Sequence, residues 1–585
     1  MQMLTSAGGQ SSFTAIGPGR PISENPLQDA GLSSARGMIK NCLSSHTICR
    51  PQKPTTLPKR VLDVGQDSNT IALHESAWNE VEKKHERGEY TALSYIRSSE
   101  ATPQTTKQNL QSHVQNVPWS TLPKLFQDAV LLTRALGIRY IFIDALCLLQ
   151  DDDQALLEES LQTHHVFTNA FLTIAATSAP SPTHPLFPPK PASFEIQATD
   201  TNNNPLATIY IREQPSHYTF KAPFDEASHM NDWELPFGNM SERANVDTPL
   251  SKDAWAYTQR LLSPRVLHFT AEEMILECRE SWTCECGRIS DAAFDARCTD
   301  SIKQDFARVV CDALGPANGV NVSSQALAST STSATPAQRN TALHLWTYIV
   351  TEFTTRHTPS PTHILPAIAP LARALSAAVG SGYIAGHFTC STLSLLWYPN
   401  PNPNTTSATT RTDLPTWSWS SCAGAPIHFD MHSAMDLACT LSFGPRGKRR
   451  GAWSPVQGEA CVLSARLVAD VVYRNAKVVR NGVGVAFRPD VCGERMCEGE
   501  GLVVVCVCMT YRSEILGIVL RVVRDEGVGD TYRRVGRFEC VECRHEDDGE
   551  DGMSEDAEAL FGYWFPEIGD MMGLEGRAVE GFTVV

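Results

Sequence analysis

The sequence predicts an α/β fold with a parallel sheet in the N-terminal half of the chain. Three short runs rich in β-branched and aromatic residues, "YTALSYI", "RYIFIDAL" and "FLTIAAT", are typical of buried strands. Two segments with helical apolar spacing alternate with these runs. Because strand, helix, strand, helix and strand follow one another in this order, we expect parallel strands joined by crossover helices.

The elements can be assigned in order from residue 90. A strand over 90–96 is followed by a polar insertion and by a helix over 122–137, which a glycine closes. The next strand ends near Asp144, a helix follows the three acids that begin at Asp151, and residues 171–177 form the third strand. Acids at that helix start are expected to cap free N–H groups.

The remainder of the chain divides by composition. We expect a disordered tail at 1–37, an α/β domain at 38–290 with a polar insertion at 181–248, a helical region at 291–410 and a β-rich region at 411–585. Ordered structure is expected to begin near Met38. Trp417 and Trp419 alternate with serines, which predicts that both side chains pack on one face of a strand.

Charge and cysteine usage limit the classes of partner. The chain of 585 residues has a formal net charge of -16, which argues against general binding to nucleic acid because such binding needs basic surfaces. The densest apolar run, residues 502–509, is too short to cross a bilayer, and no membrane span is expected. Eighteen irregularly spaced cysteines indicate reduced thiols and a cytoplasmic location.

Asp144 is the first candidate site residue. It follows an apolar strand and lies near the carboxyl end of that strand, where open α/β sheets bind their ligands. The alternative is a buried structural carboxylate satisfied by backbone N–H donors. Cys147, three residues further on, invites a thiol-nucleophile interpretation with His164 or His165, but a small core residue is the expected role.

Several blocks taken together resemble the fungal heterokaryon incompatibility (HET) domain proteins. They are "YTALSYI", "LPKLFQDAVLLTRALGIRYIFIDALCLLQDDD", "VFTNAFLTIAATSA" and "PLSKDAWAYTQRLLSPRVLHFT". The resemblance extends from about Cys42 to about Cys540. It implies a protein of fungal non-self recognition and programmed cell death. A distant similarity of this domain to Toll/interleukin-receptor (TIR) folds would suit the parallel sheet and implies that NAD hydrolysis is one candidate activity.

The resemblance carries over unevenly to single residues. Ser94 and Tyr95 match the first strand motif, whereas Arg97 stands where the family carries tryptophan. Asp144 matches the central block. Glu159 falls where the family tends to carry a helical glutamate.

The third block departs furthest from the family pattern. Asp253 replaces an arginine and Gln259 replaces a glutamate. Any ion pair or proton transfer built on those two side chains would be lost, which indicates a degenerate copy.

Two mechanisms therefore compete. In the enzymatic one, Glu159 and Asp144 are the catalytic acids of a TIR-like NAD hydrolase, with NAD bound as substrate by Ser94, Tyr95 and Arg97 and with no cofactor. In the other, the domain acts without catalysis, through self-association or protein partners. The departures from the family pattern favour the second.

Three groups of cysteine and histidine have spacings typical of metal ligands, and each offers three ligands: Cys42, His46 and Cys49; Cys278, Cys284 and Cys286; Cys540, Cys543 and His545. A structural zinc needs four. We therefore expect no metal site from any single group, and the pooling of two groups stays open.

Overall fold

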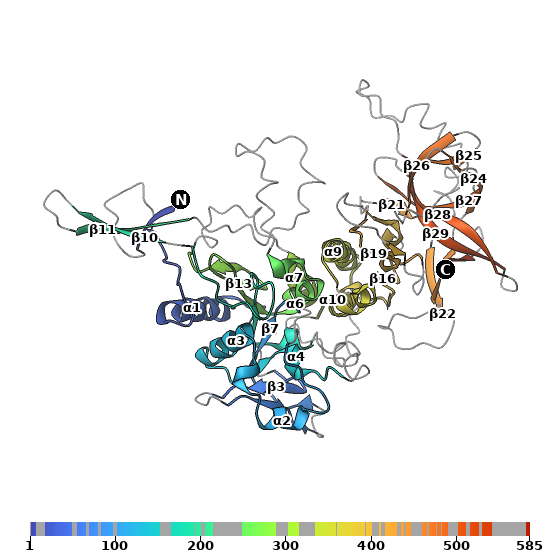
Figure 1. Cartoon of the computed structure of the whole chain (residues 1–585). Helices are drawn as coiled ribbons and strands as arrows, with labels where there is room; N and C mark the ends of the chain where they lie inside the picture. Colours follow the sequence, from blue (N-terminus) through green and yellow to red (C-terminus); the bar gives the residue numbers. More distant parts are fainter. Residues whose placement is uncertain are drawn as a thin grey trace. The chain divides into compact units, whose positions relative to one another are not determined.

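The structure is a computed structural model and forms two compact units, Met1–Ser333 and Ala334–Val585 (Figure 1). It describes residues 2–6, 18–49, 55–65, 70–79, 84–97, 102–151, 165–191, 193–199, 205–213, 248–287, 302–314, 334–358, 360–391, 393–399, 409–410 and 416–429, and ten strands between residues 434 and 584.

An eight-stranded sheet is the framework of the first unit. Its strands are, in spatial order, β14 (Trp282–Cys284), β13 (Met274–Cys278), β12 (Arg265–Phe269), β9 (Leu172–Ala175), β7 (Tyr90–Ser94), β8 (Tyr140–Phe142), β3 (Arg60–Asp63) and β4 (Ala72–Glu75).

The four central strands of this sheet are parallel. β7 pairs in parallel with both β8 and β9, and β9 pairs in parallel with β12. All residues of β7, β8 and β9 are buried, as expected for strands covered on both faces. The predicted parallel α/β domain is thus confirmed.

Antiparallel strands, which the sequence did not predict, extend the parallel core at both ends. β3 pairs antiparallel with β8 on one side, and β12, β13 and β14 form an antiparallel meander on the other. β8 therefore has one parallel and one antiparallel neighbour. A hairpin needs only a short connection, so the chain can widen the sheet at its ends without further crossover helices.

Helices cover this framework. They are α1 (Asp29–Ser45), α2 (Leu110–Gln115), α3 (Lys124–Ala135), α4 (Asp144–Cys147), α6 (Ala254–Leu262) and α7 (Ile302–Leu314), with the 3₁₀ turns η1 (Trp119–Thr121) and η4 (Pro249–Lys252). α3 lies against β8 and buries Leu125, Phe126 and Val130. The predicted helix over 122–137 is confirmed and is shorter at both ends, where Pro123 and Gly137 flank it.

The N-terminal segment contains more regular structure than its composition suggests. α1 begins at Asp29, so the expected start of order at Met38 is corrected. The Gly31 Cα lies so close to the preceding turn that an added Cβ would meet Pro26 Cα at 2.7 Å. This close approach explains the glycine, which by composition alone looks like part of a linker.

A small sheet joins the first residues to the polar insertion. Its order is β10 (Phe194–Thr199), β11 (Pro205–Arg212), β1 (Gln2–Ser6) and β2 (Pro18–Gly19). A further hairpin joins β5 (Trp78–Asn79) and β6 (Lys84–His85).

The second unit starts with two helices, α9 (Pro336–Thr354) and α10 (Ile364–Val379), which contact each other. A capping box formed by Thr335 and Gln338 starts α9, and Gly380 in the left-handed region ends α10. Residues 361–379 are apolar and long enough to cross a membrane, but 67% of their most apolar stretch is buried inside the protein, as in a core helix.

The 3₁₀ turn η6 (Pro361–His363) lies between these two helices. Tryptophans pack among the short elements that follow α10, which are β15 (Tyr383–Ile384), β16 (His387–Phe388), η7 (Leu393–Leu396), β17 (Trp397–Pro399), β18 (Thr409–Thr410), η8 (Trp419–Ser421), β19 (Cys422–Ala423) and β20 (Ile427–Phe429). The indoles of Trp346 and Trp419 donate to one carbonyl oxygen, that of Gly386, at 3.2 and 2.9 Å. Trp417 and Trp419 are buried, as expected. The predicted strand around them is wrong, because Ser418 accepts from Ser420 N and starts a 3₁₀ turn.

The chain ends in a β-rich region, as predicted. Its strands are β21 (Ala434–Leu437), β22 (Thr440–Pro445), β23 (Glu459–Ser464), β24 (Leu467–Arg474), β25 (Lys477–Arg480), β26 (Val483–Pro489), β27 (Gly501–Thr510), β28 (Ile515–Asp525), β29 (Gly529–Cys540) and β30 (Gly581–Val584). Most neighbours in this sheet are antiparallel. The limits of the predicted domains remain predictions.

Candidate functional site

Asp144 is held by side chains from the neighbouring strand. The Tyr95 hydroxyl donates to Asp144 Oδ1 at 2.6 Å, and the Arg97 guanidinium donates to Oδ2 through Nε at 2.9 Å and Nη2 at 2.5 Å. The backbone N–H of Ala145 also donates to Oδ1, at 2.7 Å. Both carboxylate oxygens are therefore occupied.

The topology explains why these side chains meet. β7 and β8 are parallel neighbours, so the residues that follow them emerge at the same edge of the sheet. Tyr95 and Arg97 follow β7, while Asp144 follows β8 and begins α4. Ile96, between the first two, packs against a core cluster that includes Leu250. Asp144 therefore lies at the carboxyl edge of the sheet, as the sequence predicted.

The turn that carries Asp144 is fixed from both sides. Arg60 of β3 is buried and donates from Nε to the Cys147 carbonyl at 2.8 Å. The Gln150 amide donates to the carbonyls of Asp144 and Leu148. Arg60 and Gln150 are therefore structural supports of this turn.

The electrostatics of the cluster favour an ionised pair. The Asp144 carboxylate raises the pKa of Arg97, and Asp253 contributes in the same direction. Burial raises the pKa of Tyr95 well above its ordinary value, and the charge of Asp144 adds to this rise. Tyr95 is thus a neutral donor, and Arg97 carries a full charge beside two acids.

Ser94 and Gln259 form the second contact at this edge. The Ser94 hydroxyl donates to Gln259 Oε1 at 2.6 Å, which links the end of β7 to α6. Asp253 is the N-cap of α6 and accepts from Ala256 N at 2.8 Å. The amide oxygen of Gln259 performs the acceptor role that a glutamate would have, without its charge.

Arg97 and Asp253, which the sequence resemblance marked as departures from the family pattern, influence one another. Arg97 supplies the positive charge next to Asp144, and Asp253 lies near enough to influence Arg97. The positive charge at this edge is therefore supplied from the end of β7, while an acid occupies the start of α6.

The structure describes only some of the other residues proposed from the sequence. Glu159 lies outside the described residues. Cys147 is buried, and burial raises its pKa to about 12, so it is a core thiol as expected. Asp151 accepts from Lys107 N rather than from any contact at this edge.

A buried charge network connects α6 with β12 and β13, and the sequence did not predict it. Glu277 of β13 is fully buried and pairs with Arg260 of α6, with Nε–Oε2 and Nη2–Oε1 distances of 2.9 Å. His268 Nε2 lies 3.2 Å from Glu277 Oε2, and its Nδ1 lies 3.0 Å from Thr177 Oγ1. Arg260 and Glu277 are seventeen residues apart, a spacing that no local motif records.

Opposing effects set the protonation of this network. Although burial alone would raise the pKa of Glu277, the charges of Arg260 and Lys303 lower it to about 2. Burial lowers the pKa of His268 and lowers that of Lys303 to about 8. Glu277 is therefore an ionised structural anion and His268 is neutral.

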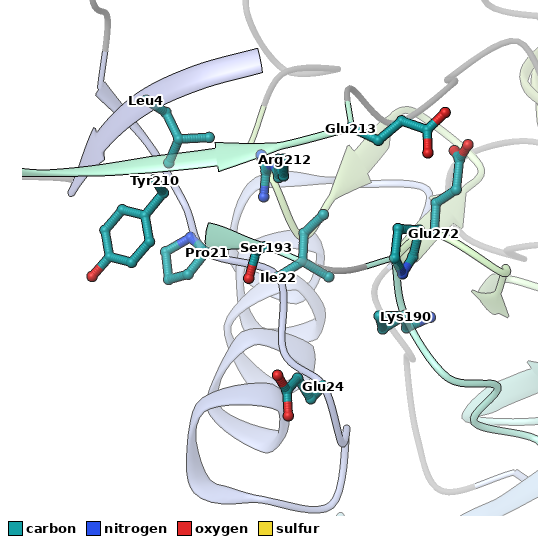
Figure 2. A pocket seen from close by; sticks show the side chains of 11 residues that line it. Leu4, Pro21, Ile22, Glu24, Lys190, Ser193, Tyr210, Arg212, Glu213 and Glu272 are labelled. Carbon is teal, nitrogen blue, oxygen red and sulfur yellow. The ribbon is translucent and has the colours of Figure 1, made fainter. Parts of the chain in front are cut away.

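A pocket lies elsewhere in the first unit, between the small sheet and the segment before α1 (Figure 2). Leu4, Ile22 and Tyr210 supply apolar lining, and Lys190, Arg212 and Glu272 supply charge. Lys190 donates to the Thr270 carbonyl at 2.8 Å. Among the described residues that line it, the pocket includes none of Ser94, Tyr95, Arg97 and Asp144.

Comparison with known families identifies the region that carries the cluster. Residues 90–255 match the family described as Heterokaryon incompatibility protein (HET). These residues are a HET domain. No curated protein and no solved structure matches the chain.

The HET match begins at the first residue of β7 and ends within the first turn of α6. It includes Tyr95, Arg97, Asp144 and Asp253, so the whole Asp144 cluster belongs to the HET domain. The chain is thus a HET domain protein, which implies a role in heterokaryon incompatibility. The wider resemblance expected from Cys42 to Cys540 extends past this match on both sides.

Proposed function

We propose that this HET domain protein acts in fungal non-self recognition and programmed cell death signalling in the cytoplasm, through self-association or a protein partner and without catalysis. The occupancy of Asp144 supports this most directly. A carboxylate that acts as a base or nucleophile needs a free oxygen facing the substrate. Tyr95, Arg97 and the Ala145 N–H occupy both oxygens here.

Exposure of the arginine supports the binding role. The Arg97 side chain is 53% exposed while Asp144 is 14% exposed, so the guanidinium lies at the surface with its charge fixed in direction by the carboxylate. Arginine held in this way is suited to contact an acidic or aromatic side chain of another protein.

Cell viability tests the signalling role. Overexpression of the wild-type chain in a fungal host should reduce viable counts, and Arg97→Ala should restore them. Arg139→Ala is a matched control, because Arg139 makes a similar exposed pair with Asp63. The proposal is wrong if the wild type leaves viability unchanged, or if both variants restore it equally.

Association can be followed on the purified chain. Sedimentation velocity over a range of concentrations, with and without a fungal cell extract, should reveal a complex that Arg97→Ala weakens and Arg139→Ala leaves intact. A species that stays monomeric in both conditions would contradict the binding role.

The alternative is a TIR-like NAD hydrolase. Its support is the gathering of Ser94, Tyr95 and Asp144 at the carboxyl edge of parallel strands, where such folds bind nucleotides. Incubation of the purified chain with NAD, beside Asp144→Asn, Glu159→Gln and the charge-restoring Gln259→Glu, tests it. Turnover by the wild type that is lost in the first two variants would favour the enzyme; no turnover above background would exclude it.

A further inference from the structure

Four sulfur and nitrogen ligands from distant parts of the sequence gather beside β13. Three come from the C-terminal half of α1 and the turn that follows it, and the fourth ends β13. Their ligand atoms all lie within 4.8 Å of one another, and the group consists of Cys42, His46, Cys49 and Cys278. The sequence offered these residues as two incomplete groups.

The distances suit a tetrahedral metal ion. Zinc–sulfur bonds of about 2.3 Å and zinc–nitrogen bonds of about 2.0 Å place tetrahedral ligands roughly 3.5–3.8 Å apart. Cys278 Sγ lies 3.3 Å from His46 Nδ1, so closure onto an ion needs only small movements. Three thiolates and one imidazole in this geometry select zinc among the common divalent ions.

The atoms around the group complete the environment of a structural site. His46 directs Nδ1 toward Cys278, and its Nε2 lies 3.3 Å from Ser281 Oγ, which can accept a hydrogen bond from the Nε2–H of a metal-bound imidazole. The backbone N–H of Ser281 donates to Cys278 Sγ at 3.2 Å. Such N–H···S contacts stabilise a thiolate.

The charge balance also fits. Three thiolates with a divalent ion leave one negative charge, and the residue that directly follows Cys278 is the buried, cationic Arg279. Cys42, Cys49 and Cys278 are buried, as closed structural zinc sites require.

We propose that Cys42, His46, Cys49 and Cys278 bind one structural zinc ion that joins α1 to β13. All four ligands lie outside the HET match, on both sides of it. The ion would connect α1, which precedes the matched region, to the β12–β14 meander, which follows it. A fragment restricted to residues 90–255 lacks the whole site.

Two of the three thiols could instead be joined in a disulfide. A disulfide would use two of them and leave the third thiol and the imidazole without a role, and the cysteines are free in the structure. A second group, Glu273, Cys284 and Cys286, offers only three ligands and makes internal hydrogen bonds.

Metal content of the full chain tests the proposal. The chain is purified under reducing conditions without chelator, and zinc is quantified by plasma mass spectrometry. We expect one zinc per chain, a loss of roughly tenfold or more in Cys278→Ser, and retention in His46→Cys, which keeps four ligands. Cys147→Ala removes a buried thiol of the same unit outside the group and should keep the metal.

Spectroscopy of the wild type covers the case in which Cys278→Ser does not fold. Zinc X-ray absorption should give three sulfur and one nitrogen neighbours, and the cobalt-substituted chain should show the strong visible bands of a tetrahedral thiolate site. A wild type without zinc after reconstitution overturns the proposal. So does zinc that persists in Cys278→Ser, or a mapped disulfide among the three cysteines. Because none of these measurements reads cell death or NAD turnover, failure here is distinct from failure of the proposed function.

Discussion

Two of the arginine–carboxylate pairs in the first unit differ in how far they are exposed to solvent. Arg97 and Asp144 lie at the carboxyl edge of the sheet, with side chains 53% and 14% exposed. Arg260 and Glu277 lie behind it, 13% and 0% exposed. In each pair the guanidinium reaches the carboxylate through both Nε and Nη2.

The difference in exposure separates the roles of the two pairs. Water screens an exposed pair, which contributes at most about 1 kcal/mol to stability. Removal of one partner from a buried pair leaves an uncompensated charge and costs about 3–5 kcal/mol. The Glu277 pair therefore belongs to the framework, whereas the Asp144 pair can be altered for function at little cost to folding.

Glu277→Gln should have the largest effect. It keeps the shape of the side chain and removes the charge that compensates Arg260, so we expect the free energy of unfolding of the first unit to fall by about 3–5 kcal/mol. Urea unfolding followed by fluorescence measures it. Glu89→Gln, on an exposed residue, should change it by less than about 0.5 kcal/mol. Equal effects of the two substitutions would show that the buried pair is not structural.

The same network should make stability depend on pH. The folded pKa of Glu277, about 2, lies below its ordinary 4.5, so its contribution is complete above pH 4.5 and is lost as the pH falls toward 2. The loss amounts to roughly 3 kcal/mol. His268, whose pKa is lowered below 6.5 by burial, adds a loss as the pH falls below 6.5.

Urea unfolding between pH 7 and pH 3 measures this dependence. In Glu277→Gln, the free energy of unfolding should depend less on pH below pH 4.5. Part of its decrease below pH 6.5, which comes from His268, should remain. A curve for the variant that parallels the wild type throughout would assign the acid loss to other carboxylates.

Tyr95→Phe should have an intermediate effect on the exposed pair. The substitution keeps the buried ring and removes the hydroxyl that donates to Asp144, a hydrogen bond to a charged group worth about 1.5–3 kcal/mol. Thermal unfolding of the first unit reports it. An unchanged midpoint would mean that water replaces the hydroxyl and that the carboxylate is more accessible than its contacts indicate.

Arg97→Ala should have the smallest effect on stability. Because more than half of the side chain is exposed, we expect a loss below about 1 kcal/mol, similar to that of Arg139→Ala. The two substitutions should differ in viability and association only. A loss as large as that of Glu277→Gln would make the Asp144 pair part of the framework and remove its separation from the buried pair.

The sequence predicted the helices and strands in which apolar residues recur at a regular spacing. β7, α3, β8 and β9 lie within the segments expected from the sequence, because buried strands and an amphipathic helix each leave a short-range signature. The placement of Asp144 followed from the parallel order of those strands. Its partner Arg97 was noted in the sequence only as a departure from the family pattern.

Such short-range patterns do not predict which segments far apart in the sequence contact each other. The antiparallel pairings at the ends of the sheet depend on which strand finds which edge, and two of the four candidate zinc ligands, His46 and Cys278, are 232 residues apart. The alternation at Trp417 and Trp419 has the period of a strand, but serine hydroxyls that bond to nearby backbone compete with that outcome.

The crossover between β9 and β12 has a consequence for how the chain can vary. These strands pair in register, Thr173 with Val266, although the polar insertion lies between them. Loop-closure entropy grows with the logarithm of length, so doubling this connection would change the folding free energy by only about 0.6 kcal/mol. Added length outside the helices and strands of this connection is therefore nearly neutral for the sheet, whereas we expect a single added residue between β8 and Asp144 to turn the carboxylate away from Tyr95.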